Sequence, residues 1–306
     1  MPKPKSKTIS SKTTHKTKSI ATPSRSRQIK VAPKITGSFQ LFGKSLMLIK
    51  RNWKLFGVII IIYGLLAIVL VRGFGGSLDL ALLKKLLHSQ TNNLTAGFTL
   101  FGYLLGGAGS VGTQAGSVYQ TILVILISLI TIWSLREILG GKKVKAKDAF
   151  YKGTYPLIPF ILVLLIIGLQ LLPLVLGAWL YGTILGTSIA VNLFEKFCWT
   201  ILFLLLAFWS IYMVSTSVIG LYVVTLPNMT PFKALRSAKQ LVKHRRFKII
   251  RKVLFLPLAL FVIGALIMVP LILLLTSLAV WVYFVLSMVG LLVIHTYMYL
   301  LYRELL

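Results

Sequence analysis

Long apolar runs separated by short charged segments make up most of the chain. A membrane-spanning helix needs about 20 apolar residues. The last run is therefore long enough for two helices, which we expect to join between Pro270 and Ser277. Length alone does not decide how many helices the second and third runs hold. Stretches without Lys, Arg, Asp or Glu occupy residues 55–71, 86–135, 153–194, 197–232 and 253–302.

The charged segments decide the number of spans. Residues 1–54 carry 14 basic and no acidic residues, 136–152 carry 6 and 2, and 233–252 carry 9 and none. Because Lys and Arg collect on the cytoplasmic side of membrane proteins, an even number of spans should separate neighbouring basic segments. We therefore predict six spans with both termini cytoplasmic, which gives net charges of +27 inside and +2 outside. The spans are expected near residues 54–72, 118–136, 155–176, 197–222, 253–275 and 279–301.

One unit occurs three times along the chain: a short basic, partly apolar segment, a span outwards, a loop and a span back. The short segments begin near Ser38, Asp148 and Pro231. Such parallel repeats are known in multi-pass proteins. The predicted fold class is all-α: an integral membrane bundle of six transmembrane helices with amphipathic interfacial helices, arranged as three pseudo-repeats of two spans.

Two regions differ in composition. Residues 1–35 are mainly Lys, Ser, Thr and Pro with scattered Arg, have no acidic residue and lack apolar periodicity, so a disordered basic tail is expected there. No secretory signal is expected in it, because no apolar stretch follows within the usual distance. Residues 36–306 should form the six-span membrane domain.

Two segments beside the spans have the pattern of amphipathic helices. Residues 36–53 combine apolar side chains at helical spacing with Lys and Arg, and Ser38 is a plausible N-cap. Residues 230–246 offer Thr230 as N-cap and Pro231 at the first helical position. One face of the first helix carries Phe39, Phe42, Leu46, Ile49 and Trp53; the second has an apolar face of Ala234, Leu235, Ala238, Leu241 and Val242 and a basic face of Lys233, Arg236, Lys239 and Lys243.

Both helices are expected to lie at the membrane surface. The basic face of residues 230–246 should contact anionic phospholipid headgroups, with a solvated cytoplasmic helix as the alternative. We therefore name Lys233, Arg236, Lys239 and Lys243 as the candidate contact residues for anionic lipid or for a membrane-protein partner.

Composition supports the membrane assignment. Hydrophobic residues make up 57% of the chain and charged residues only 13%, against about a quarter charged in soluble domains, which excludes a soluble fold. The excess of 34 Lys and Arg over 5 Asp and Glu fits cytoplasmic loops, so specific nucleic-acid binding is not expected. Cys198 is the one cysteine, which excludes an internal disulfide and leaves a zinc site or thiol redox pair without ligands.

Few polar residues lie within the spans, where such residues are functional candidates. His295 and Gln170 are the intramembrane candidates, and for both, as for Gln120, a hydrogen bond to a neighbouring helix is the simpler interpretation. For Arg136 and Glu137, an interfacial pair or a snorkelling Arg is the favoured interpretation. The sequence contains no recognisable catalytic or metal-binding motif, so we expect neither catalytic residues, nor a cofactor, nor a metal, and no enzyme. The Gly-rich residues 97–117 suggest close helix packing or a re-entrant segment.

The stretch from Val224 to Lys243 contains Thr-Pro-Phe-Lys-Ala-Leu-Arg-Ser-Ala-Lys-Gln-Leu-Val-Lys. With the segment Ser38 to Leu48, it resembles the membrane domain attached to bacterial glycerophosphoryl diester phosphodiesterases and related uncharacterised multi-pass inner-membrane proteins. The resemblance covers about residues 36–306. The acidic residue often found before the motif is replaced by Leu226 or Pro227, and no soluble catalytic domain follows. The resemblance implies a membrane module of unassigned activity, without phosphodiesterase activity.

These observations favour a nonenzymatic protein of the bacterial inner membrane that binds a partner or anionic phospholipids at the cytoplasmic face. The alternative is a transporter or lipid-handling protein. Its substrate should be apolar or lipidic, because an ionic substrate would need charge inside the membrane. An intramembrane enzyme is the third and least favoured hypothesis.

Overall fold

The computed structural model describes residues 36–70, 114–186, 192–243 and 245–306. Within these ranges the protein is entirely helical apart from its connections, so the predicted all-α class is confirmed. The predicted disordered tail over residues 1–35 and most of the Gly-rich segment 97–117 lie outside the described residues.

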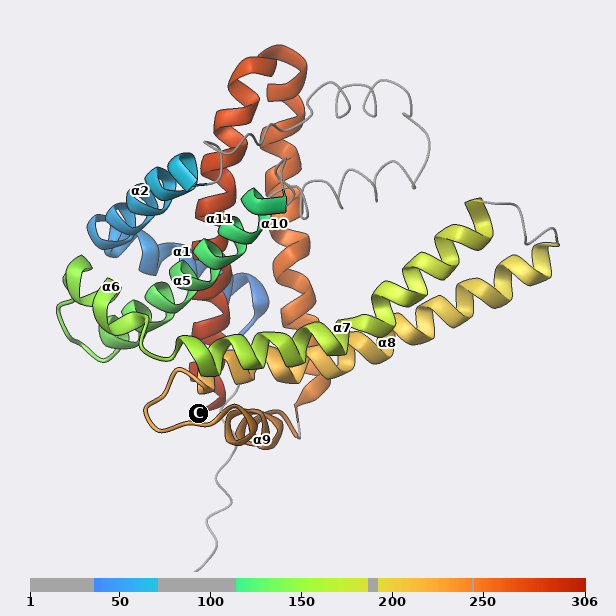
Figure 1. The fold of residues 1–306 in the computed structure, drawn as a ribbon, viewed down its shortest axis with the longest axis horizontal. Helices are drawn as coiled ribbons and strands as arrows, with labels where there is room; N and C mark the ends of the chain where they lie inside the picture. Colours follow the sequence, from blue (N-terminus) through green and yellow to red (C-terminus); the bar gives the residue numbers. More distant parts are fainter. Residues whose placement is uncertain (1–35, 71–113, 187–191, 244) are drawn as a thin grey trace, which may run out of the picture. The chain divides into compact units, whose positions relative to one another are not determined.

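Short and long helices alternate in a regular order. Among the described helices, a short helix is followed by two long ones, and this order occurs three times. In the described ranges, six helices are long and apolar enough to cross a membrane, as predicted. With the labels of Figure 1, the described helices are α1 (Ser38–Arg51), α2 (Trp53–Leu70), α5 (Gln114–Leu139), α6 (Ala146–Gly153), α7 (Leu157–Gly186), α8 (Leu193–Val223), α9 (Pro231–Val242), α10 (Arg246–Leu274) and α11 (Thr276–Leu305).

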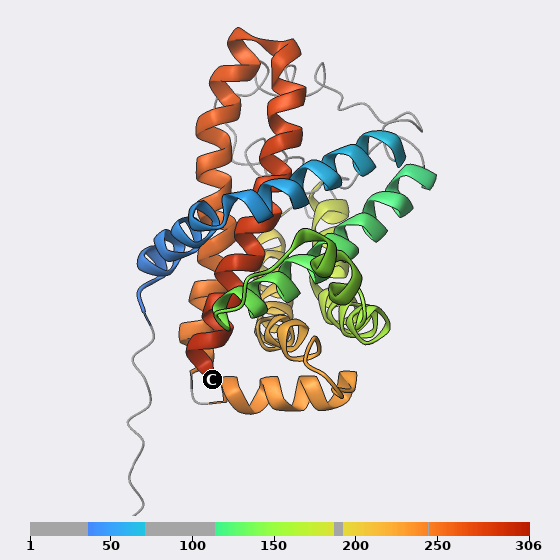
Figure 2. The same ribbon diagram turned by 90° about the vertical axis from the view of Figure 1, so that its left-hand side faces the viewer.

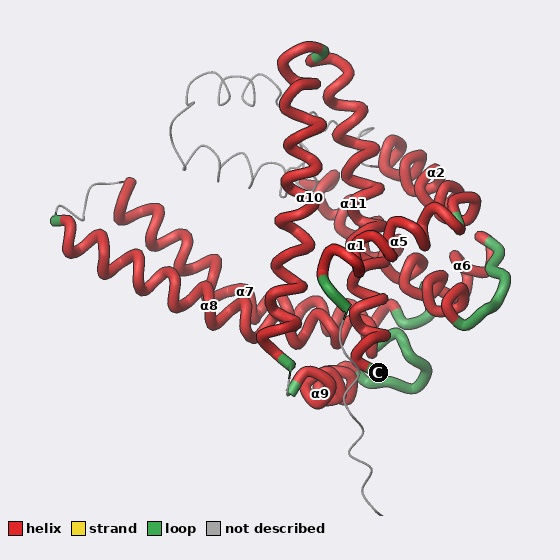
Figure 3. The backbone as a smooth tube through the Cα atoms, turned by 180° about the vertical axis from the view of Figure 1, so that it is seen from behind, coloured by secondary structure: helices red, strands yellow, loops and turns green. Residues whose placement is uncertain are grey.

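The long helices pack as pairs of chain neighbours. The α7–α8 and α10–α11 pairs run side by side in Figures 1 and 3, and α2 contacts α5. Helix α11 also contacts α1, α2, α5 and α8. Half of the most apolar stretch of α5 and of α11 is buried, against 6% for α8 and 11% for α10. The core therefore lies around α5 and α11, while α8 and α10 leave most of their apolar surface for lipid.

Contacts between distant segments bring several helix ends together. The Arg136 guanidinium, near the end of α5, donates a hydrogen bond to the Thr225 carbonyl just after α8 (2.7 Å). Near the start of α10, the Lys252 ammonium donates to the carbonyl of Thr36. Thr36 in turn donates to the Glu304 carboxylate at the end of α11. The Tyr222 ring of α8 stacks on the Tyr302 ring of α11 and links the two sets of contacts. The starts of α1 and α10 and the ends of α5, α8 and α11 therefore share one end of the bundle, here called the basic end.

Several helix boundaries differ from those predicted. Helix α10 begins at Arg246 rather than near residue 253, and α8 begins at Leu193 rather than near 197. Lys and Glu mark where a chain meets the membrane surface, but they are good helix formers, so a helix can begin before the membrane does. Helix α7 runs through Pro173 to Gly186 instead of ending near residue 176. Beyond Pro173 the chain stays apolar, and in lipid a helix satisfies its backbone polar groups.

The predicted cap of α1 is wrong. Gly37, not Ser38, occupies the N-cap position, and Ser38 is the first helical residue. The Ser38 side chain shares a hydrogen bond with the Tyr297 side chain of α11. This hydroxyl therefore joins α1 to the core instead of capping the helix.

Candidate functional site

Helix α9 begins as its sequence predicts. Thr230 is at the N-cap position and Pro231 opens the helix, where its missing N–H leaves no hydrogen bond unmade. The preceding turn contains Asn228 with a φ of 61°, a left-handed conformation that Asn tolerates better than most residues. The turn leads the chain from the end of α8 directly into α9, at the basic end.

The apolar face of α9 packs against protein. Ala234, Ala238 and Val242 are completely buried, and α9 contacts both α8 and α7. Gly220 of α8 makes the close approach possible, because a Cβ atom there would lie 3.0 Å from Leu235 Cδ2 and 3.8 Å from the Ala238 Cβ. The surface that an interfacial helix would place in lipid is thus covered by α8 and α7.

The opposite face of α9 is cationic and exposed. Lys233, Arg236, Lys239 and Lys243 are all exposed to solvent. The ion pairs found in the described part of the chain both involve Glu137, so these four cations have no acidic partner there. We call these four side chains the α9 cationic face. Figure 2 shows α9 near the C-terminus, at the basic end. Contact of this face with headgroups stays a prediction.

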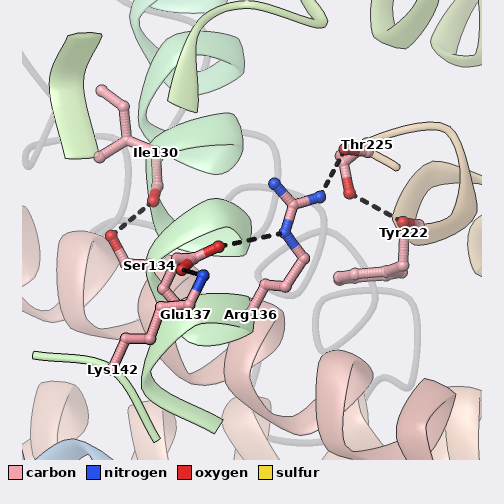
Figure 4. Close-up of polar contacts among 7 residues, drawn as sticks. All are labelled: Ile130, Ser134, Arg136, Glu137, Lys142, Tyr222 and Thr225. Carbon is pink, nitrogen blue, oxygen red and sulfur yellow. Dashed lines mark hydrogen bonds and ion pairs between the residues drawn. The ribbon is translucent and has the colours of Figure 1, made fainter. Parts of the chain in front are cut away.

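A polar junction ties the end of α5 to the end of α8 (Figure 4). The expected pair of Arg136 and Glu137 is present but long, with 4.0 Å between Arg136 Nε and Glu137 Oε1. Glu137 lies closer to Lys142, at 2.8 Å. Arg136 donates instead to the Thr225 carbonyl, and the Thr225 hydroxyl donates to the Tyr222 carbonyl (2.8 Å). Arg136 therefore satisfies a carbonyl left over at the end of α8.

His295 of α11 is buried and joins three helices. Its Nδ1 lies 3.2 Å from the Tyr222 hydroxyl of α8, and its Nε2 lies 2.8 Å from the Ser128 hydroxyl of α5. The Ser128 hydroxyl donates to the Val124 carbonyl of its own helix (2.6 Å). One assignment of protons satisfies all three contacts: Tyr222 donates to Nδ1, Nε2 donates to Ser128, and Ser128 donates to Val124. The expected hydrogen bonds to neighbouring helices are present, and a neutral imidazole completes them.

The two glutamines differ. The Gln120 amide donates to the Tyr63 hydroxyl of α2 (3.1 Å), as expected. Gln170 Oε1, on α7, is buried without a hydrogen-bond partner among the described residues, and only the Gln170 backbone carbonyl accepts a bond, from Ser210 of α8 (2.7 Å). The interhelical side-chain bond expected of this oxygen is not found there. The contacts of His295 and those of Gln170 therefore involve different residues.

One cluster at the basic end was not found from the sequence. Lys252 is almost completely buried, and its ammonium donates to the carbonyl of Thr36, whose amide and hydroxyl donate to Glu304. The Tyr297 hydroxyl donates to the Lys252 carbonyl (3.3 Å). Only the rarity of acidic residues could have drawn attention to Glu304. The cluster anchors the chain immediately before α1.

No group of three or more His, Cys, Asp or Glu residues in the described ranges is placed to hold a metal ion. Comparisons with protein-family models, with curated proteins and with solved structures find no match to this chain. The resemblance to the membrane domain of bacterial glycerophosphoryl diester phosphodiesterases therefore stays a prediction.

Proposed function

We propose that this chain is a nonenzymatic protein of the bacterial cytoplasmic membrane, with its basic end and both termini in the cytoplasm. It acts by binding an acidic surface through the α9 cationic face. Anionic phospholipid headgroups are the nearest such surface, and an acidic region of a membrane-protein partner is the other.

The observation that carries this proposal is the division of α9 into a buried face and a charged one. A helix whose apolar face is covered by α8 and α7 has no need of lipid to hold it in place. The exposed cations are therefore presented at fixed positions. Each basic residue near an anionic membrane surface contributes about 1 kcal/mol, and salt screens the attraction over about 10 Å at 0.1 M.

The test reverses the charge of this face. Lys233, Arg236, Lys239 and Lys243 are replaced together by Glu, and the full-length protein is purified from its native membrane at low salt. The control replaces four other exposed lysines of α1 and α6 with Glu: Lys44, Lys50, Lys147 and Lys152.

We expect the α9 variant to lose most of its copurifying anionic phospholipid, or one acidic partner protein, while the control variant retains it. Both variants should fold, because the changed side chains are exposed. Equal retention in the two variants, or equal loss, would contradict a specific role of α9. Mass spectrometry of the copurified lipids and proteins identifies which acidic surface is bound.

One observation favours a second candidate function, that of a transporter or lipid-handling protein. The buried Gln170 Oε1 lacks a hydrogen-bond partner in the described part of the chain, and an unpaired polar group is costly within a membrane. A transporter or lipid-handling protein could use it to bind a polar group of an otherwise apolar or lipidic substrate. If Gln170→Leu or His295→Leu abolished the cellular function at unchanged abundance while the charge-reversed α9 variant worked normally, this candidate would replace the first.

A further inference from the structure

A cleft lies between the junction of α1 with α2 and the loop that joins α5 to α6. Its volume is 830 Å³. One part of its lining is apolar, from Leu55 and Val58 at the start of α2 and from Ile138 and Leu139 at the end of α5. The other part is basic, from Arg51, Lys54, Lys142 and Lys143. The cleft is separate in sequence from the α9 cationic face, and no residue of α9 lines it.

The loop on one side of the cleft has a defined conformation. The Gly141 amide donates to the Ile138 carbonyl and the Lys142 amide to the Glu137 carbonyl, both at 3.0 Å. This pattern is a Schellman motif, which ends a helix with a residue in the left-handed region. Gly141 meets that need with a φ of 81°. The turn carries Lys142 and Lys143 back to the cleft.

The charges in the cleft are unbalanced. Lys142 pairs with Glu137 at 2.8 Å. Arg51, Lys54 and Lys143 are exposed and make no ion pair with any described residue, and no carboxylate lines the cleft. Three cations around an opening with no acidic residue would attract a small anionic group such as a phosphate.

The position of the cleft matches the depth of lipid headgroups. Trp53 lines it, is mostly exposed and is the first residue of the span α2. Trp is enriched where a transmembrane helix meets the membrane surface. From Trp53 the chain enters the apolar layer, so Val58 lies about one turn deeper than Lys54, and Leu55 lies between them. The basic part of the lining is therefore at headgroup level and the apolar part at the level of the first acyl carbons.

We propose that this cleft binds one anionic phospholipid. Arg51, Lys54 and Lys143 bind the phosphate, and the beginning of an acyl chain lies against Leu55, Val58 and Ile138. A diffuse basic surface would attract many headgroups without holding one, whereas this arrangement recognises a phosphate and a chain together. The proposal requires the membrane location but not the action proposed for α9.

The experiment measures lipid bound to the full-length protein by native mass spectrometry in detergent, with dioleoyl phosphatidylglycerol as the probe. The cleft variant replaces Arg51, Lys54 and Lys143 by Gln. The matched control replaces Lys44, Lys147 and Lys152 by Gln, three exposed lysines of α1 and α6 that do not line the cleft, and so removes the same charge. We expect roughly hundredfold weaker binding of one lipid in the cleft variant and little change in the control. Equal weakening in both would overturn the proposal.

Two further arms test the shape of the site and the ligand. Val58→Trp keeps every charge and should displace the lipid by filling the apolar part of the lining; unchanged binding would contradict the acyl-chain contact. Glycerol 3-phosphate, which has the phosphate but no chain, should compete weakly. If it displaced the lipid at equal concentration, the cleft would be a site for soluble phosphates and not for a lipid. The two proposals are tested by different variants. If the charge-reversed α9 variant alone lost its copurifying lipid or partner, that loss would concern the α9 cationic face, and the lipid site in the cleft would remain.

Discussion

Replacing Gly220 by Leu should detach α9 from α8. A Cβ atom at Gly220 would already lie 3.0 Å from Leu235 Cδ2, and a leucine places three more carbons where Leu235 and Ala238 now pack. Overpacking of this kind costs about 1–3 kcal/mol. Since α9 is held by one buried face, we expect that cost to fall on the docking of α9. The undocked fraction of α9 should rise about 5- to 150-fold.

Labelling of a buried cysteine measures this fraction. Ala238→Cys is introduced in a Cys198→Ser background, and its reaction with a maleimide is followed in detergent. Ala238 is completely buried, so the cysteine should react slowly in the parent and faster once Gly220→Leu is added. Gly168→Leu is the matched control, because a Cβ atom at Gly168 of α7 meets nothing within 4 Å.

Two results would refute the reasoning. If the cysteine at position 238 reacted in the parent as fast as one at the exposed position Lys239, α9 would not be docked at all. If Gly220→Leu and Gly168→Leu changed the rate equally, the close approach at Gly220 would not hold α9 in place.

Three further substitutions test other contacts. Gly153→Ala should lower the free energy of unfolding by about 1–3 kcal/mol, because its Cβ atom would lie 3.0 Å from the Ile130 Cα. Gly182→Ala is the control and should not lower it, because a Cβ atom there meets nothing within 4 Å. Thermal unfolding in detergent compares the two variants. His295→Leu should cost about 1 kcal/mol, since each interhelical hydrogen bond in a membrane contributes roughly 0.6 kcal/mol, and unfolding in bicelles measures it. Glu304→Gln should loosen the segment before α1, seen as faster proteolysis there, and an unchanged rate would contradict the described cluster.

For the described residues, the six candidate spans and their pairing could be predicted from the sequence, because both depend on properties that act along the chain. Apolar runs long enough to cross a bilayer predict helices, and the expectation that the three basic segments lie on one side predicts an even number of crossings between them. Helix ends were less predictable. Charge located the membrane boundary near residue 253, but α10 already begins at Arg246.

The candidate site could be predicted only in part. The two faces of α9 follow from helical spacing, but the covering of Ala234 and Ala238 depends on Gly220, which belongs to another helix. His295 was recognised as a polar residue in a span. Its partners lie 73 and 167 residues away, and no local pattern indicates Tyr222 or Ser128. Such partners are set by the packing of helices, which hydropathy does not describe.

The central claim is that all three basic segments lie at the cytoplasmic face of the membrane, and cysteine labelling in intact cells tests it most directly. Single cysteines replace Lys145, Lys239 or Glu195 in a Cys198→Ser background and are exposed to a membrane-impermeant thiol reagent. We expect the cysteine at position 195, at the opposite end of α8, to react in intact cells, and those at 145 and 239 to react only after the cells are broken. Reaction at 145 or 239 in intact cells would contradict the cytoplasmic placement of the basic end.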